Sequence, residues 1–202
     1  MTTIELLERT KAAWGSIRSA NAEEKNRLLL AMAESLEANQ ADILRENQKD
    51  MDAARGSISD VMLDRLYLDK DRIDAMADGI RATVALPDHT GRILAQIDHP
   101  NGMKIYKKQV PLGLVAIIYE SRPNVTSDAA ALTIKSGNVC MLRSGKEAYR
   151  SSHAIVTALK AGIEAAGGDG EYVDYEDTGD SDGYYIDDDY HVDISSFEGC
   201  WY

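Results

Sequence analysis

Hydrophobic residues recur every three or four positions through the first part of the chain, which is the spacing of one face of an α-helix. Asn21 and Glu24 form a capping-box pattern just before one apolar stripe. Gly56 and Pro87 follow two later stripes, at positions where a helix is expected to stop. The pattern predicts a series of amphipathic helices over residues 3–86, whose apolar faces pack into a core.

The hydrophobic period changes to alternation after residue 90. Ile93, Ala95 and Ile97 alternate with polar residues, and a second alternating run follows Asn101-Gly102. An Asn-Gly pair between two alternating segments is a strong hairpin signal. We therefore predict a β-hairpin around residues 92–110.

Two continuous apolar runs follow the hairpin, and each precedes a helical pattern. Residues 114–119 and 139–142 are expected to be strands buried on both faces, and residues 126–135 and 147–166 to be helices. The order strand, helix, strand, helix implies a parallel sheet with right-handed crossovers. The predicted fold class is α/β: N-terminal helices, a β-hairpin and a βαβα unit.

The charge of the chain is concentrated near its C-terminal end. The chain has 202 residues and a net charge of −12, and residues 169–202 hold 12 of the 34 acids and no Lys or Arg. Residues 1–168 contain equal numbers of acids and bases. We expect a folded body over 1–168 and a disordered, acidic, tyrosine-rich tail over 169–202. A neutral body with an acidic tail argues against a nucleic-acid partner, because phosphates would be repelled.

Cysteine usage and hydropathy favour a soluble, cytoplasmic protein. Two cysteines, Cys140 and Cys200, are too few for a disulfide framework or a four-cysteine zinc site. The N-terminus lacks the layout of a secretion signal. The longest apolar run, residues 114–119, is far shorter than a membrane span.

A candidate phosphate site lies between the second apolar run and the helix after it. This loop contains Arg143, Ser144, Gly145, Lys146 and Glu147. The start of a helix presents free backbone N–H groups, Gly145 lets a phosphate come close, and the two cations add positive charge. The loop matches neither a Walker motif nor the Gly-x-Gly-x-x-Gly fingerprint, so a short connection with solvent-facing bases remains the alternative.

Four other features bear on possible chemistry. Asn124 follows the first apolar run, where an amide can donate to a developing oxyanion, although a turn-forming Asn beside Pro123 is the alternative. Cys140 lies within an apolar run without a nearby base, which indicates an unreactive core cysteine. Residues 178–189 imitate a calcium loop, but a solvated acidic segment is the favoured interpretation. The four histidines are scattered, so no metal site is expected.

Three segments in the middle of the chain carry more specific motifs. They are 110–126 (VPLGLVAIIYESRPNVT), 132–138 (LTIKSGN) and 142–148 (LRSGKEA). These motifs resemble gamma-glutamyl phosphate reductase, also called glutamate-5-semialdehyde dehydrogenase, a family of the aldehyde dehydrogenase superfamily. The resemblance runs in order through about residues 1–167. It implies that residues 1–168 are the N-terminal part of an aldehyde-dehydrogenase-type, Rossmann-like cofactor domain.

The resemblance also implies a reaction. The family reduces L-glutamate 5-phosphate to L-glutamate 5-semialdehyde with NADPH, in proline biosynthesis. A cysteine thiolate attacks the acyl phosphate, and the resulting thioester takes hydride from the nicotinamide. Asn124 matches the oxyanion-hole Asn of the family, and Arg143 matches a position that contacts the adenosine side of the cofactor. Residues 144–147 share that loop.

The tail departs from the family. Family members are longer, their catalytic cysteine lies downstream, and Cys200 is not in the family's cysteine motif. We therefore expect a truncated member without turnover. One alternative is a non-catalytic fragment that binds nucleotide weakly, or that joins a full-length subunit or a second copy through the hairpin at 92–110. The other is an interaction module whose acidic tail is the functional part.

Overall fold

The computed structural model describes residues 2–176, and five α-helices occupy the first half of this range. They are α1 (Thr3–Ile17), α2 (Ala22–Ala38), α3 (Gln40–Ala54), α4 (Asp60–Leu66) and α5 (Lys70–Val84). The predicted capping box is present at α2, where the Asn21 side chain accepts from the Glu24 backbone and the Glu24 side chain accepts from the Asn21 backbone. Gly56 follows α3 with a φ of 84°, a left-handed conformation that favours glycine. The prediction of N-terminal helices is confirmed.

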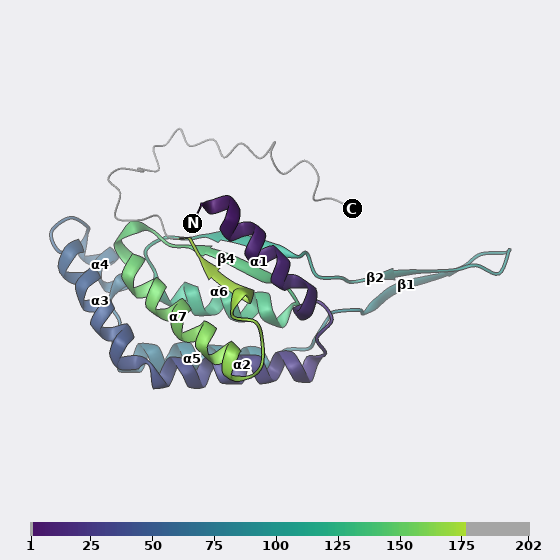
Figure 1. Ribbon diagram of the computed structural model, residues 1–202, viewed down its shortest axis with the longest axis horizontal. Helices are drawn as coiled ribbons and strands as arrows, with labels where there is room; N and C mark the ends of the chain where they lie inside the picture. Colours follow the sequence, from purple (N-terminus) through teal and green to yellow (C-terminus); the bar gives the residue numbers. More distant parts are fainter. Residues whose placement is uncertain (1, 177–202) are drawn as a thin grey trace.

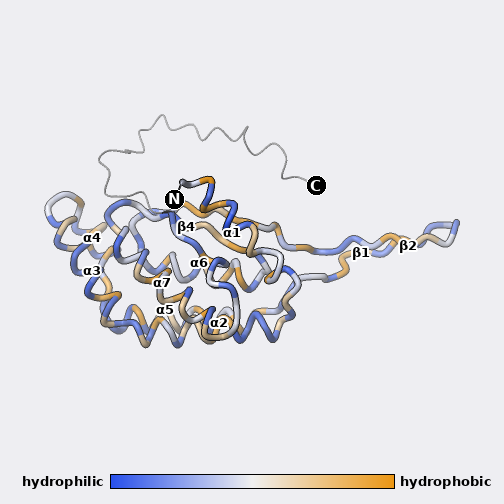
Figure 2. Tube along the Cα trace, viewed as in Figure 1, coloured by the Kyte–Doolittle hydropathy of each residue, from blue (hydrophilic) through white to orange (hydrophobic). Residues whose placement is uncertain are grey.

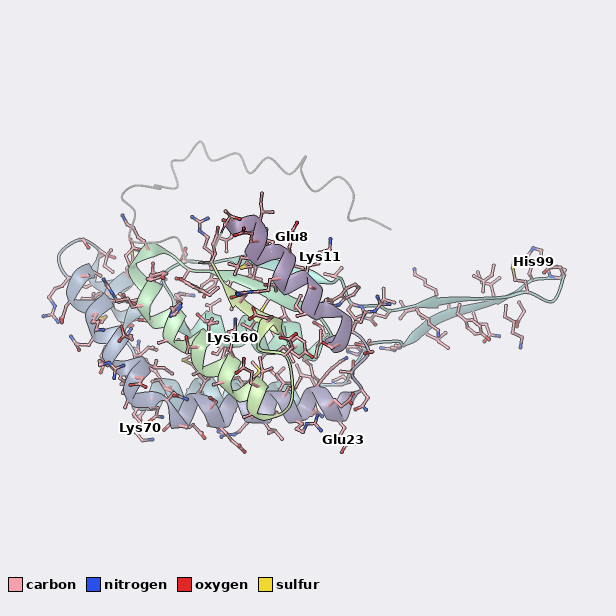
Figure 3. The ribbon with its side chains drawn as sticks, in the orientation of Figure 1. Glu8, Lys11, Glu23, Lys70, His99 and Lys160 are labelled. Atoms are coloured by element: carbon pink, nitrogen blue, oxygen red, sulfur yellow. The ribbon has the colours of Figure 1, made fainter. Side chains whose placement is uncertain are left out.

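A two-stranded antiparallel hairpin extends away from the helices (Figure 1). It consists of β1 (Ile93–Asp98) and β2 (Lys104–Lys108), with Ile97 opposite Ile105. Gly102 adopts a φ of 87° in the turn, and His99 lies near the tip (Figure 3). Every residue of the two strands is exposed to solvent. The predicted hairpin is therefore present, and its apolar side chains are left uncovered by the described residues.

A three-stranded parallel sheet forms the centre of the body. The elements after the hairpin are β3 (Leu114–Ile118), α6 (Pro123–Lys135), β4 (Val139–Arg143), the 3₁₀-helix η1 (Lys146–Ala148), α7 (Tyr149–Ala165), the 3₁₀-helix η2 (Gly170–Tyr172) and β5 (Val173–Tyr175). The strand order is β3-β4-β5, and both pairings are parallel. This arrangement confirms the α/β fold class and the βαβα unit.

The burial of β3 differs from the prediction. Residues 114–119 were expected to be covered on both faces, but β3 is an edge strand of the described sheet, and Ile118 is 63% exposed. The central strand β4 has neighbours on both sides, and Val139 through Leu142 are buried. A continuous apolar run predicts a strand, but it does not distinguish a central strand from an edge strand.

The first eight residues of the expected acidic tail also differ from the prediction. Residues 170–175 form η2 and β5, and β5 is buried in the sheet rather than disordered. The charge of buried Asp174 is compensated there, because Arg9 from α1 lies 2.5 Å away and Lys160 from α7 lies 3.4 Å away. Residues 177–202, with Cys200 and the calcium-like stretch, lie outside the described residues.

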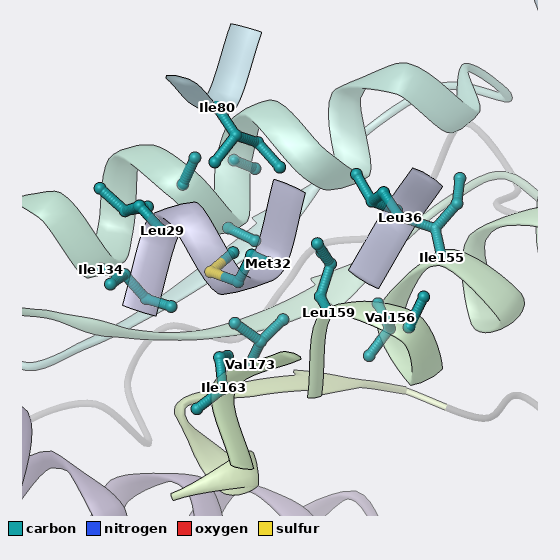
Figure 4. Packing of buried hydrophobic residues seen from close by; sticks show 14 of the residues in the cluster. Leu29, Met32, Leu36, Ile80, Ile134, Ile155, Val156, Leu159, Ile163 and Val173 are labelled. Atoms are coloured by element: carbon teal, nitrogen blue, oxygen red, sulfur yellow. The ribbon is translucent and has the colours of Figure 1, made fainter. Parts of the chain in front are cut away.

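The hydrophobic core lies mainly on one face of the sheet. Helices α6 and α7 cover that face, and α2, α3 and α5 form a further layer against them (Figure 1). Apolar residues of α2, α5, α6, α7 and β5 meet in this region, among them Leu29, Met32, Leu36, Ile80, Ile134, Leu159 and Val173 (Figure 4). Hydropathy accordingly alternates along these helices between the core and the solvent side (Figure 2).

Helix α1 covers the opposite face of the sheet (Figure 1). The Trp14 indole donates to the backbone oxygen of Gly137 at 3.0 Å, which ties α1 to the turn before β4. Helices cover both faces of the sheet. The edge at the carboxyl ends of the strands is therefore where loops can present side chains to a ligand.

Candidate functional site

The candidate site lies where β3, β4 and β5 end. Ile118 pairs with Arg143, and the backbone N–H of Tyr119 donates to the oxygen of Arg143 at 3.0 Å. The parallel register therefore brings the loop after β3 and the loop after β4 to the same edge of the sheet. This juxtaposition follows from the parallel sheet that the sequence predicted, because the carboxyl ends of neighbouring parallel strands share an edge.

The chain passes from the buried interior to the surface between Leu142 and Lys146. Leu142 is buried, Arg143 is partly exposed and Lys146 is exposed. The hydroxyls of Ser144 and Tyr175 share a hydrogen bond of 2.6 Å. The loop after β4 is thus anchored to the neighbouring strand β5, while Lys146 stays exposed to solvent.

Position 145 requires glycine because a neighbouring side chain leaves no room for a Cβ atom, and not because of its backbone conformation. Its φ of −60° and ψ of 153° are open to any residue. A Cβ at this position would stand 2.3 Å from the Ser121 hydroxyl oxygen. The absence of a side chain therefore lets the loops after β3 and β4 approach each other closely.

Glu147 also takes part in the contact between these two loops. The buried Ser121 hydroxyl donates to its carboxylate at 2.6 Å. Glu147 was predicted among the cofactor-binding residues, and here its carboxylate joins the two loops. The role of Ser121 was not predicted from the sequence, because a serine after a strand carries no distinguishing pattern.

Asn124 lies in the first turn of α6, just beyond the end of β3. The helix begins at Pro123, earlier than the predicted start, because proline suits the first helical position. The Asn124 side chain is exposed, and its backbone oxygen accepts from the Ser127 hydroxyl at 2.9 Å. A helix terminus thus holds the Asn124 amide at the same edge as residues 143–147.

Arg143 has an acidic partner from the segment that the sequence assigned to the tail. Its Nη1 atom lies 3.3 Å from Oε2 of Glu176, which directly follows β5. The other oxygen of Glu176 accepts from the Thr3 hydroxyl at 2.8 Å. Charge patterning alone gave no signal for this pair, since Glu176 is one acid among twelve in the tail sequence.

Buried hydroxyl and thiol groups beneath this edge remain protonated near neutral pH. Burial raises the pKa of Tyr119, whose hydroxyl shares a 2.7 Å hydrogen bond with Thr126. Burial also raises the pKa of the Cys140 thiol to about 12. Cys140 is fully buried in β4, so its predicted place in the core is confirmed.

Within residues 2–176, no three His, Cys, Asp or Glu side chains gather as ligands for a metal ion. None of the helices in this range is both long enough and apolar enough to cross a bilayer.

The curated relatives of this chain share one name. No protein-family model matches the chain. Gamma-glutamyl phosphate reductase of Streptococcus pneumoniae serotype 19F is 61% identical over 160 residues, which are 79% of this chain and 38% of that protein. The chain therefore spans about two fifths of the length of the curated relatives it matches.

Solved structures extend the comparison to the fold. Gamma-glutamyl phosphate reductase of Thermotoga maritima matches 87% of this chain and 42% of its own, with a TM-score of 0.84 and 33% identity. The Saccharomyces cerevisiae protein of that name matches with a TM-score of 0.81 and 26% identity, over 88% of this chain and 47% of its own. An acetylating aldehyde dehydrogenase from Geobacillus thermoglucosidasius, 12% identical over 85% of this chain and 35% of its own, shares the fold with a TM-score of 0.62. The resemblance inferred from the sequence is confirmed: the chain is similar to a partial segment of gamma-glutamyl phosphate reductase and has an aldehyde-dehydrogenase-type fold.

Proposed function

We propose that this chain forms the nucleotide-binding part of an enzyme that reduces L-glutamate 5-phosphate to L-glutamate 5-semialdehyde with NADPH. The observation that carries this proposal is the placement of Arg143, Lys146 and Asn124 at one edge of a parallel sheet. Such an edge is where open α/β sheets bind nucleotides. The names of the relatives supply the substrate class, a glutamyl phosphate.

The residues at the edge fit a nicotinamide dinucleotide. Lys146 and Arg143 supply positive charge for phosphate, and Gly145 stands between them in the loop after β4. The Ser144–Tyr175 hydrogen bond holds the loop in place before a ligand arrives. When bound, the nucleotide would supply the hydride for the reduction.

Asn124 is proposed to hold the carbonyl oxygen of the substrate. Its amide stands in the first turn of α6, where backbone N–H groups and the helix dipole also favour negative charge. Preorganised donors of this kind stabilise the oxyanion that develops when a carbonyl is attacked. The helix restricts the backbone of Asn124, so little reorganisation is needed.

The described residues do not supply the cysteine thiolate that the reaction uses. Cys140 is enclosed in β4, and its raised pKa keeps it as a thiol at neutral pH. We therefore expect this 202-residue chain to bind nucleotide but not to turn over by itself. In a coupled assay with glutamate, ATP and glutamate 5-kinase, NADPH oxidation should stay at background. Activity that disappears on Cys200→Ala would contradict this expectation.

Nucleotide titration tests the site itself. Arg143→Ala should weaken NADPH binding by about 5- to 30-fold, because one charge-assisted contact to phosphate is lost. Arg45→Ala is the matched control, since Arg45 is exposed on α3 and pairs with Asp42 instead. Equal NADPH affinities of the wild type and Arg143→Ala in a fluorescence titration would overturn the proposed role of the loop.

A second candidate function is association with another subunit through the hairpin. Ile93, Leu94 and Ile97 are all more than half exposed on β1. Apolar side chains exposed in such numbers on one element mark an interaction surface. A second copy of this chain or a full-length relative is the proposed partner.

A further inference from the structure

We propose that Glu176 is a specificity-determining residue that opposes an additional phosphate on the adenosine ribose of a bound nucleotide. This inference rests on the proposed function, because it assumes that a dinucleotide binds beside Arg143. Glu176 belongs to the segment that the sequence assigned to an acidic tail, yet the structure seats it at the candidate site.

The position of Arg143 in the sheet indicates which part of the nucleotide it would meet. In doubly wound sheets, the residue about 20 positions beyond the first strand-to-helix turn faces the adenosine ribose. Arg143 stands at this distance from the turn after β3, at the end of the next strand. An acid at this place binds a free ribose hydroxyl, whereas an arginine receives a ribose phosphate. In this protein an arginine, Arg143, and an acid, Glu176, stand together at this place.

The contacts of Glu176 hold its charge against Arg143. One carboxylate oxygen lies 3.3 Å from the guanidinium, and the other accepts from the Thr3 hydroxyl. The two charged side chains are only 27% and 18% exposed, so water screens the pair incompletely. A phosphate that approaches Arg143 must therefore compete with a carboxylate that is already in place.

A cavity of about 750 Å³ lies beside Glu176, between α1, α7 and β5, and residues 143–147 do not line it. Glu176 is partly exposed and faces Arg143, so a ligand bound at Arg143 also meets the carboxylate. A ribose hydroxyl can donate to the carboxylate, but a phosphate group is repelled by it. Lys146 adds a positive charge in the same loop, so Glu176 would lower the preference for the phosphorylated nucleotide without excluding it.

The experiment compares the affinities of the full 202-residue chain for NADPH and NADH. Glu176→Gln removes the charge and keeps the shape. We expect it to tighten NADPH binding about threefold to fivefold, the range of a partly exposed ion pair, and to leave NADH binding unchanged or weaker. Glu171→Gln is the matched control, since it removes the same charge from the same segment, but Glu171 pairs with Arg9 and Lys160. This control should leave the ratio of the two affinities unchanged.

Two results overturn the inference alone. An unchanged ratio in Glu176→Gln would show that the carboxylate does not select the nucleotide. Weaker NADPH binding in this variant would show that Glu176 only positions Arg143. Glu176→Asp keeps the charge but withdraws it by one methylene. It should shift the ratio of the NADPH and NADH affinities in the same direction as Glu176→Gln, but by less. If Glu176→Gln does not fold, Glu176→Asp tests the inference in its place. Binding of neither nucleotide to the wild type or any variant would instead overturn the proposed function.

Discussion

At the scale of single residues, the site depends on a close contact between Gly145 and Ser121. The two residues lie on loops that follow different strands, and Glu147 accepts the Ser121 hydrogen bond at 2.6 Å. The contact leaves no room for a side chain at position 145, although the backbone there is relaxed. The physical requirement on Gly145 is therefore imposed by a neighbour in space.

This requirement predicts how substitutions combine. Gly145→Ala should destabilise the fold by about 1–3 kcal/mol, because the new methyl group overlaps the Ser121 hydroxyl. Adding Ser121→Gly should recover part of that loss, so the two effects will not be additive. Urea unfolding gives the free energies of unfolding.

Gly15→Ala is the control for the same chemical change. A Cβ at Gly15 would have no neighbour within 4 Å, and the residue lies inside α1. This substitution should be neutral or stabilising by about 0.5–1 kcal/mol. Equal losses in Gly145→Ala and in the double variant would show that Ser121 is not the cause.

At the scale of elements, strand β5 is held in the sheet by charges from two helices. Asp174 is buried in β5 and lies 2.5 Å from Arg9 of α1 and 3.4 Å from Lys160 of α7. Burial by itself would raise the pKa of Asp174. The hydrogen bond from Arg9 and the charge of Lys160 outweigh this effect, so the pKa lies below its ordinary value of 3.8.

The lowered pKa predicts how stability depends on pH. The stabilisation from ionised Asp174 is fully present above about pH 4 and is lost as the pH falls through the folded-state pKa. Asp174→Asn should cost about 1–3 kcal/mol at pH 7 and should flatten the acid side of the stability profile. Urea titrations between about pH 2 and pH 7, the range in which carboxyl groups titrate, measure both effects.

Asp64→Asn is the control for the acid profile. Asp64 pairs with Arg72 on the surface, and such an exposed pair contributes about 0–1 kcal/mol. Its substitution should leave the acid side nearly unchanged. A profile for Asp174→Asn that is parallel to the wild type would contradict the assignment.

At the scale of the whole molecule, apolar surface remains uncovered at the hairpin and on β3. Ile97 and Ile105 are paired across the hairpin, and both are exposed. Strand β3 has no partner on its outer side among residues 2–176, and Ile118 is exposed there. Exposed apolar strands with free backbone groups favour association.

This surface predicts that the chain self-associates. Ile97→Lys should weaken association, because a charge is placed on the exposed hairpin, while the free energy of unfolding should change by no more than about 0.5 kcal/mol. Sedimentation velocity measures the association. Val61→Lys is the matched control, since Val61 is 64% exposed, close to the 59% of Ile97, but lies on α4. A monomeric wild type, or equal weakening by both substitutions, would contradict the role of the hairpin.

The sequence by itself determined the order and type of the elements. Capping residues at α2, the Asn-Gly turn of the hairpin and the apolar runs before α6 and α7 act through near neighbours in the chain, so their patterns were readable. The same local patterns, with the resemblance, predicted Asn124 and residues 143–147 as candidates at one edge of the sheet.

The tertiary structure alone decided which strand is central, where the sheet ends and what the site residues touch. The apolar run at 114–119 became an edge strand, and residues 173–175 of the expected acidic tail became β5. Burial and charge compensation depend on partners far away in the sequence, such as Arg9 and Lys160 for Asp174. For the same reason only the fold places Glu176 against Arg143, because no local pattern records a contact across 33 residues.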